Sequence, residues 1–106
     1  MKIALPLISE SELASDFSKS SYVGIYDVVE GNLNVISLAS QSMTTIQSFI
    51  FETMKSLDTQ WVISPNFSFM ALRVFKENKI NVLKASGTNL NENIDFFKTG
   101  ILVPFS

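Results

Sequence analysis

The chain has 106 residues, of which 46% are hydrophobic, and a formal net charge of −2 with a pI near 4.9. It contains no histidine and no cysteine, the residues that usually bind zinc, copper and iron–sulfur clusters and that act as general base or thiol nucleophile. The composition therefore excludes a zinc site, a thiol enzyme and a Ser-His-Asp hydrolase, and the acidic balance argues against a nucleic-acid partner.

Length and composition predict one globular domain over residues 1–106. The apolar run at residues 3–8 is shorter than the core of a signal peptide and Glu10 and Glu12 follow it, so we expect a buried first strand. No apolar run approaches the roughly 20 residues of a membrane span. The absence of cysteine fits a reducing compartment, and we expect a cytoplasmic protein without a membrane partner.

The first third of the chain predicts three strands. Residues 2–8 form a nearly continuous apolar run, as a strand buried on both faces does, although Pro6 removes one ladder donor. Residues 22–29 and 33–38 are two further strand-like runs. Gly31 lies in the short turn between them and is suited to positive φ, so the two runs predict a hairpin.

The middle of the chain changes to helical periodicity. Apolar residues at helical spacing predict a helix over residues 45–57, and residues 61–63 then form a short buried strand. A second helix starts next, either with Ser64 as cap and Pro65 at the first position or with Asn66 as cap. The residues expected on its inward face are Phe67, Met70, Ala71, Val74 and Phe75.

The last third predicts a strand at residues 80–83 and a third helix. Asn89, followed three residues later by Glu92, is a capping-box-like start, and Gly100 ends the helix. Its inward face consists of Leu90, Ile94 and Phe97. The order β-β-β-α-β-α-β-α predicts a three-layer α/β fold with a mixed five-stranded sheet.

Polar segments follow four of the predicted strands. Right-handed crossovers would point the first, third, fourth and fifth strands the same way, and ligands of open α/β sheets bind where such strands end. The segments that would meet there are residues 9–21, 40–45, 64–67 and 85–89. Hydroxyls, amides and helix N-termini favour an anionic ligand. The alternative is that these residues only cap helices or face solvent.

A few side chains outside these segments suggest other roles. Met54 and Met70 lie on helix faces and are expected to fill the core, whereas the role of Met43, in the loop at the sheet edge, stays open. Phe51 and Phe69 fall off the inward faces of their helices, so we expect them to contribute to self-association or to docking of a partner. No carboxylates cluster in the predicted order, and no enzymatic activity is expected.

Several of these segments carry motifs of one known family. The start Met1-Lys2-Ile3-Ala4-Leu5-Pro6, the stretch at residues 14–20 with the aromatic strand ending at Asp27, and Ser64-Pro65-Asn66-Phe67 occur in the family's order, as do residues 79–82 and 87–93. On these motifs the chain resembles the dinitrogenase iron-molybdenum cofactor biosynthesis family, whose small members bind or carry nitrogenase metalloclusters and their precursors. The resemblance covers essentially the whole chain and implies a ribonuclease H-like fold.

The resemblance also implies a function. It suggests a non-enzymatic accessory protein that carries an iron-molybdenum or iron–sulfur cluster, and a cluster-assembly protein is one partner expected to dock at Phe51 and Phe69. The residues expected to bind the cofactor are Asp16, Phe17, Ser18, Lys19, Met43, Thr44, Thr45, Ser64, Pro65, Asn66, Gly87 and Thr88. Asp16 replaces the motif histidine and Ser18 its glycine, and Lys19 is the only cation of the first loop. The alternative is a metal-free relative that acts through protein contacts.

Overall fold

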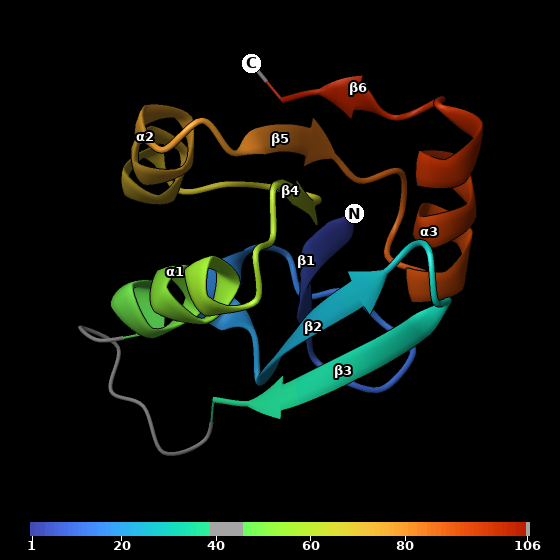
Figure 1. Ribbon diagram of the computed structural model, residues 1–106, viewed down its shortest axis with the longest axis horizontal. Helices are drawn as coiled ribbons and strands as arrows, with labels where there is room; N and C mark the ends of the chain where they lie inside the picture. The colour runs from blue at the N-terminus through green and yellow to red at the C-terminus, as the bar shows by residue number, and fades with distance from the viewer. Residues whose placement is uncertain (39–45, 106) are drawn as a thin grey trace.

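The computed structural model describes residues 1–38 and 46–105, without the side chains of residues 46–49. Within this part the chain forms one six-stranded sheet and three α-helices (Figure 1). The strands are β1 (Lys2–Leu7), β2 (Tyr22–Asp27), β3 (Asn32–Ser37), β4 (Trp61–Ser64), β5 (Asn81–Lys84) and β6 (Val103–Pro104). The helices are α1 (Ile46–Ser56), α2 (Phe69–Glu77) and α3 (Leu90–Thr99), with a short 3₁₀ turn η1 (Phe17–Lys19). None of the described helices is long and apolar enough to cross a membrane.

The sheet has the strand order β3-β2-β1-β4-β5-β6. β1 pairs parallel with β4, and β4 pairs parallel with β5, whereas β2 runs antiparallel to both β1 and β3. As predicted, β1, β3, β4 and β5 therefore point the same way. The parallel pairing of β1 ends with Ala4 opposite Val62, so the missing N–H of Pro6 lies beyond that ladder.

The prediction of five strands is wrong, because β6 follows α3 and pairs antiparallel with β5, with Pro104 opposite Leu83. The Phe105 N–H extends this pairing to the Val82 carbonyl (3.1 Å), and the Phe105 ring lies 5.0 Å from that of Phe67. A two-residue strand that includes a proline is too short to show strand periodicity. Its pairing therefore depends on tertiary contacts that the local sequence does not reveal.

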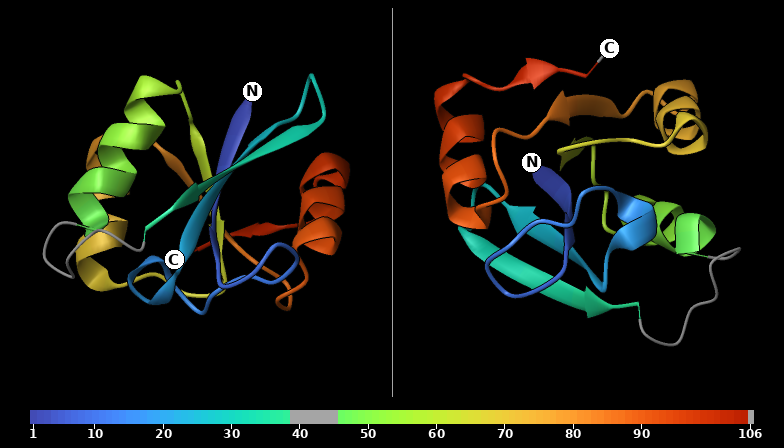
Figure 2. Two further views of the ribbon diagram at one scale, coloured as in Figure 1. Left: turned by 90° about the horizontal axis from the view of Figure 1, so that it is seen from below. Right: turned by 180° about the vertical axis from the view of Figure 1, so that it is seen from behind.

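The sheet lies between two helical layers. α1 and α2 cover one face and α3 the other (Figure 2). β1 contributes to both cores, since Ala4 packs on the α1 and α2 side while Ile3, Leu5 and Leu7 pack on the α3 side. All four side chains are fully buried, which explains why β1 shows a continuous apolar run instead of alternation.

The predicted hairpin is confirmed. β2 and β3 pair along their whole length, and Gly31 in the connecting turn has a φ of 74°. The Asp27 carboxylate accepts hydrogen bonds from the N–H groups of Glu30 (3.1 Å) and Val29 (3.0 Å). The bond from Glu30 is the largest cause of a lowered Asp27 pKa, and partial desolvation opposes it.

Both predicted starts of the second helix are wrong. α2 begins at Phe69, and the Ser68 hydroxyl caps it by accepting a hydrogen bond from the Ala71 N–H (3.1 Å). The helix does not begin before Ser68 because Phe67 first enters the core, where it meets the rings of Phe17, Phe75 and Phe105. The prediction that Met70 fills the core is also wrong: Ala71 faces the sheet, and Met70, 58% exposed, lies beside it.

The three helices end in the same way. Each has a residue in the left-handed region just after it, and the N–H of that residue donates to the carbonyl three residues earlier, as in a Schellman motif. α3 ends at Gly100 (φ 73°), as predicted. α1 and α2 instead place Asp58 (φ 57°) and Lys79 (φ 60°) at this position, where a side chain is strained.

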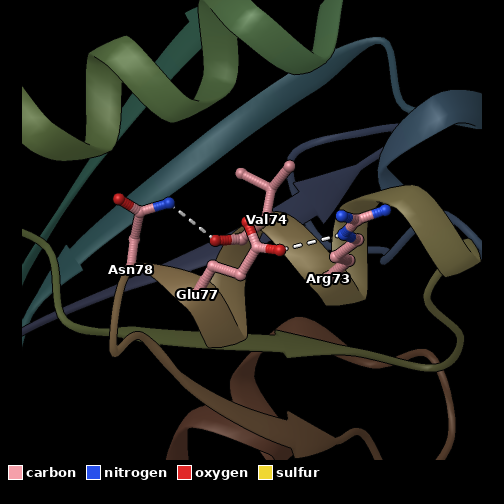
Figure 3. A network of polar contacts seen from close by, with 4 residues as sticks. All are labelled: Arg73, Val74, Glu77 and Asn78. Atoms are coloured by element: carbon pink, nitrogen blue, oxygen red, sulfur yellow. Dashed lines mark hydrogen bonds and ion pairs between the residues drawn. The ribbon is translucent and has the colours of Figure 1, made fainter.

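The last turn of α2 carries a small polar network (Figure 3). The Asn78 carboxamide donates to the Val74 carbonyl (2.8 Å), and Arg73 forms an ion pair with Glu77 (2.9 Å). The hydrogen bond to Glu77 raises the pKa of Arg73. Since both side chains of the pair are exposed, the pair adds little to the stability of the fold.

Candidate functional site

Three of the four predicted polar segments lie together at the carboxyl ends of β1, β4 and β5. The Leu13 N–H donates to the Thr88 carbonyl (2.7 Å), which joins the first loop to the loop after β5. The Phe17 ring lies 6.2 Å from that of Phe67, which joins the first loop to the segment after β4. We call residues 9–21, 64–67 and 85–89 the carboxyl-edge surface.

The fourth segment, residues 40–45, lies outside the described residues. It includes the candidate residues Met43, Thr44 and Thr45, so their part in a site stays a prediction.

Apolar side chains of the first loop fill the inside of this edge. Leu13, Ala14 and Phe17 are each at most 2% exposed. The Phe17 ring also makes an edge contact with Phe75 (5.7 Å). Phe17 is therefore a core side chain, and a ligand of the carboxyl-edge surface would lie outside it.

Asp16 and Ser18 bond mainly to each other. The Asp16 carboxylate accepts hydrogen bonds from the N–H of Ser18 (2.8 Å) and from the Ser18 hydroxyl, and so caps η1. The Ser20 hydroxyl closes the other end of η1 by donating to the Phe17 carbonyl (2.7 Å). These bonds fix the shape of the loop, and they leave Lys19, in the last turn of η1, exposed.

The serine of the segment after β4 also makes a hydrogen bond within its own segment. Ser64 is fully buried and its hydroxyl donates to the Asn66 carbonyl (2.6 Å). Pro65 is half-buried, whereas Asn66 is exposed. Of the three candidate residues here, Asn66 offers its side chain to solvent, while Ser64 holds the turn.

Asn93 of α3 fixes the loop after β5 through hydrogen bonds, and the sequence did not single it out as a functional residue. Asn93 is fully buried, and its carboxamide accepts from the Ser86 N–H (2.8 Å) and donates to the carbonyls of Ser86 (3.1 Å) and Asn89 (2.8 Å). The sequence did carry a sign of this role, because a polar residue at position 93 lies between Leu90 and Ile94 on the face of the helix that is predicted to point inward. Asn89 caps α3 as predicted, by accepting from the Glu92 N–H (2.9 Å).

Gly87 and Thr88 lie at the exposed tip of this loop. Gly87 has a φ of 73°, which favours glycine. The N–H groups of Gly87 and Thr88 make no hydrogen bond within the described residues. They are therefore donors that a ligand can use.

The charges of the surface do not form a metal site. The first loop carries three carboxylates, on Glu10, Glu12 and Asp16, and the single cation of Lys19. Within residues 1–38 and 46–105, no three acidic side chains lie close enough together to hold a metal ion. A cluster bound here would need to bring its own metal ligands and would be held by directed N–H donors and Lys19.

One known protein family matches nearly the whole chain. The family described as dinitrogenase iron-molybdenum cofactor matches residues 1–100. The chain belongs to this family. Three segments on which the resemblance was based, residues 14–20, 64–67 and the start of 87–93, lie in the carboxyl-edge surface.

Solved structures of other proteins have the same fold as this chain. A NifB-like protein from Thermotoga has 23% identity and a TM-score of 0.77, with 99% of this chain and 96% of that chain covered. A dinitrogenase-like protein from Methanocaldococcus jannaschii has 23% identity and a TM-score of 0.78, covering 100% and 95%. The apo form of the orange protein from Desulfovibrio gigas has 11% identity and a TM-score of 0.84, covering 99% and 92%. A search of curated proteins returned no match.

Proposed function

We propose that this chain is a non-enzymatic accessory protein that carries an iron-molybdenum or iron–sulfur cluster, or a precursor of one, on the carboxyl-edge surface. The observation that carries the proposal is the convergence of the family's motif segments, joined by the 2.7 Å bond between Leu13 and Thr88. The ribonuclease H-like assignment and an exchange of the cluster with an assembly protein of the cytoplasm belong to the same proposal and stay predictions.

The chemistry of the surface suits a preformed cluster better than free metal ions. The sequence has no histidine or cysteine to replace sulfide ligands. The N–H groups of Gly87 and Thr88, the ammonium of Lys19 and the N–H groups of Phe69 and Met70 at the start of α2 are hydrogen-bond donors. Such donors can bind the sulfides or the oxyanion groups of a cluster that keeps its own metal–sulfide bonds.

The test is an anaerobic titration of the purified protein with a cluster donor. Visible absorption and co-elution of metal with protein on size exclusion measure binding. We expect stoichiometric co-elution for the native chain and its loss in Lys19→Ala. Lys76→Ala is the matched control, because Lys76 is an exposed lysine in the last turn of α2, outside the carboxyl-edge surface. Absence of co-elution for the native chain contradicts the proposal.

The second candidate function is a metal-free protein-interaction module. It is favoured by Phe69, which is 78% exposed, and by Met70, which is 58% exposed, side by side just beyond the Ser64–Ser68 turn. Large apolar side chains that gather on a surface often mark an interface. Phe51, the other candidate for docking, is half-buried over a small cavity that Phe75 also lines, so it covers the core as well.

Self-association tests this second function directly. If Phe69 docks a second copy, light scattering shows a mass that rises with concentration, and Phe69→Ser abolishes the rise. Val29→Ser is the matched control, since Val29 is 83% exposed in the hairpin turn. A monomer at every concentration would remove the second copy as the partner.

A further inference from the structure

The α3 side of the sheet holds a cavity of about 430 Å³. Its main lining residues are Trp61, Asn81, Leu83, Phe97, Leu102 and Pro104. The cavity exists because α3 is the only described helix on this face (Figure 2). The helix leaves the side chains of Trp61, Phe97 and Leu102 only half-buried.

The lining is aromatic, apolar and uncharged. The rings of Trp61 and Phe97 form an edge-to-face pair, with centroids 5.2 Å apart and planes at 76°. None of the eight lining residues is acidic or basic. A charged ligand would lose hydration here without gaining a counter-charge, whereas an aromatic ring can add a further stacked or edge contact to the existing pair.

Two of the lining residues, Trp61 and Asn81, carry polar groups with hydrogen-bonding capacity left. The indole N–H of Trp61 makes no hydrogen bond within the described residues, and the side chain is half-buried. The Asn81 carboxamide makes only a long contact to the Gln60 carbonyl (3.4 Å). Small-molecule sites combine such an apolar lining with a few polar groups that orient the ligand.

We propose that this cavity binds an uncharged small molecule with one aromatic ring and one hydrogen-bond acceptor. The ring packs on the pair of Trp61 and Phe97, and the acceptor bonds to the Trp61 indole N–H. The volume lies in the range of roughly 300–1,000 Å³ found for small-molecule sites. The cavity shares no residue with the carboxyl-edge surface, so this proposal stands or falls independently of cluster binding.

Trp61 is the only tryptophan of the chain, so its indole N–H gives a single cross-peak in a nitrogen–proton correlation spectrum. The experiment titrates the native chain with acetophenone, which has one ring and one carbonyl acceptor. We expect a saturable shift of the Trp61 indole peak and of the backbone peaks of the lining residues. Benzoate, which is charged, and acetylcyclohexane, which lacks the aromatic ring, should bind at least about tenfold more weakly.

Adjacent residues provide a matched pair of variants. Leu102→Phe adds bulk to the cavity and should weaken acetophenone binding by about tenfold. Ile101→Phe makes the same kind of change at a residue that is 60% exposed and outside the lining, so binding should be unchanged. Trp61→Phe, followed by ligand-observed saturation transfer, removes the donor but keeps a ring and should also weaken binding. Thermal unfolding shows whether each variant is folded.

Three results would overturn the proposal. The first is no saturable shift up to the solubility limit of acetophenone. The second is equal affinity for acetophenone and benzoate, or equal affinity in all folded variants. The third is an indole peak that moves with protein concentration alone, which would show that a second copy covers this face.

Discussion

The two faces of the sheet are covered to different extents. In the core under α1 and α2, the cavity beside Phe17 and Phe75 is only about 10 Å³, and the larger cavities on this side, of about 180 and 370 Å³, lie at its edge beside Asp58 and beside Leu57. On the other face, α3 alone leaves a cavity of about 430 Å³ beside Trp61. Four phenylalanine rings that contact one another fill the centre of the core under α1 and α2. We therefore expect the stability of this fold to depend mainly on the face with two helices, while the face with one helix keeps space for a ligand.

Alanine substitutions of one phenylalanine on each face test this difference, and they should give the largest effect. Phe75→Ala removes a ring that is 4% exposed and contacts Phe17 and Phe67, so it should lower the free energy of unfolding by about 3–5 kcal/mol. Phe97→Ala removes a half-buried ring and should cost about 1–2 kcal/mol. Denaturant unfolding of both variants is the measurement. Equal decreases in the free energy of unfolding would show that the two faces contribute equally to stability.

The second largest effect is expected at Asn93, which fixes the loop after β5 to α3. Asn93→Ala should lower the free energy of unfolding by about 2–3 kcal/mol, because it removes the three hydrogen bonds that the fully buried carboxamide makes with Ser86 and Asn89. Hydrogen exchange of the Ser86 amide should accelerate in the variant. Asn91→Ala, an exposed position on the same helix, is the control and should change little. A stable Asn93→Ala with unchanged exchange would show that α3 does not hold the loop.

Substitutions at the positive-φ residues that follow the helices should have opposite effects on stability on the two faces. Lys79→Gly should stabilise the chain by about 1 kcal/mol, because it removes the strain of a side chain at positive φ after α2. Asp58→Gly should gain less, since Asp tolerates this region better. Gly100→Ala after α3 should cost about 1 kcal/mol. Thermal unfolding compares the three, and a destabilised Lys79→Gly would contradict the strain assigned to α2.

The smallest effect is expected in the hairpin at the edge of the sheet. The lowered pKa of Asp27 means that its carboxylate stabilises the folded state above the usual Asp pKa, and that this contribution is lost as pH falls through the folded pKa. Asp27→Asn should therefore be less stable than the native chain at neutral pH, and the difference should begin to shrink as pH falls through about 4 and vanish only below the lowered folded pKa. A difference that persists in acid would point to the shape of the turn instead of the charge.

The parts of the fold that were predicted correctly have local signals. Gly31 and Gly100 lie where positive φ is needed, and Asn89 is a good cap. The start of α2 was missed because Ser64-Pro65-Asn66 has the composition of a helix start. The burial of Phe67, a tertiary effect, overrides that local signal.

The candidate site was predicted in its location but not in its details. Strand direction alone brings the first loop, the β4–α2 segment and the β5–α3 loop together, so topology was sufficient. The roles of single residues depend on which hydrogen bonds they make. Asp16 and Ser64 stabilise their own loops, and the buried amide that holds Gly87 and Thr88 in place comes from Asn93, inside a helix.

The most direct test of the central claim, that the carboxyl-edge surface carries a cluster, is amide hydrogen exchange with and without a bound cluster donor under anaerobic conditions. We expect slower exchange at residues 16–19 and at Gly87 and Thr88, with no change at Asn81 and Leu83 beside the α3-side cavity. Cluster binding without protection of those loops, or with protection only elsewhere, would contradict it.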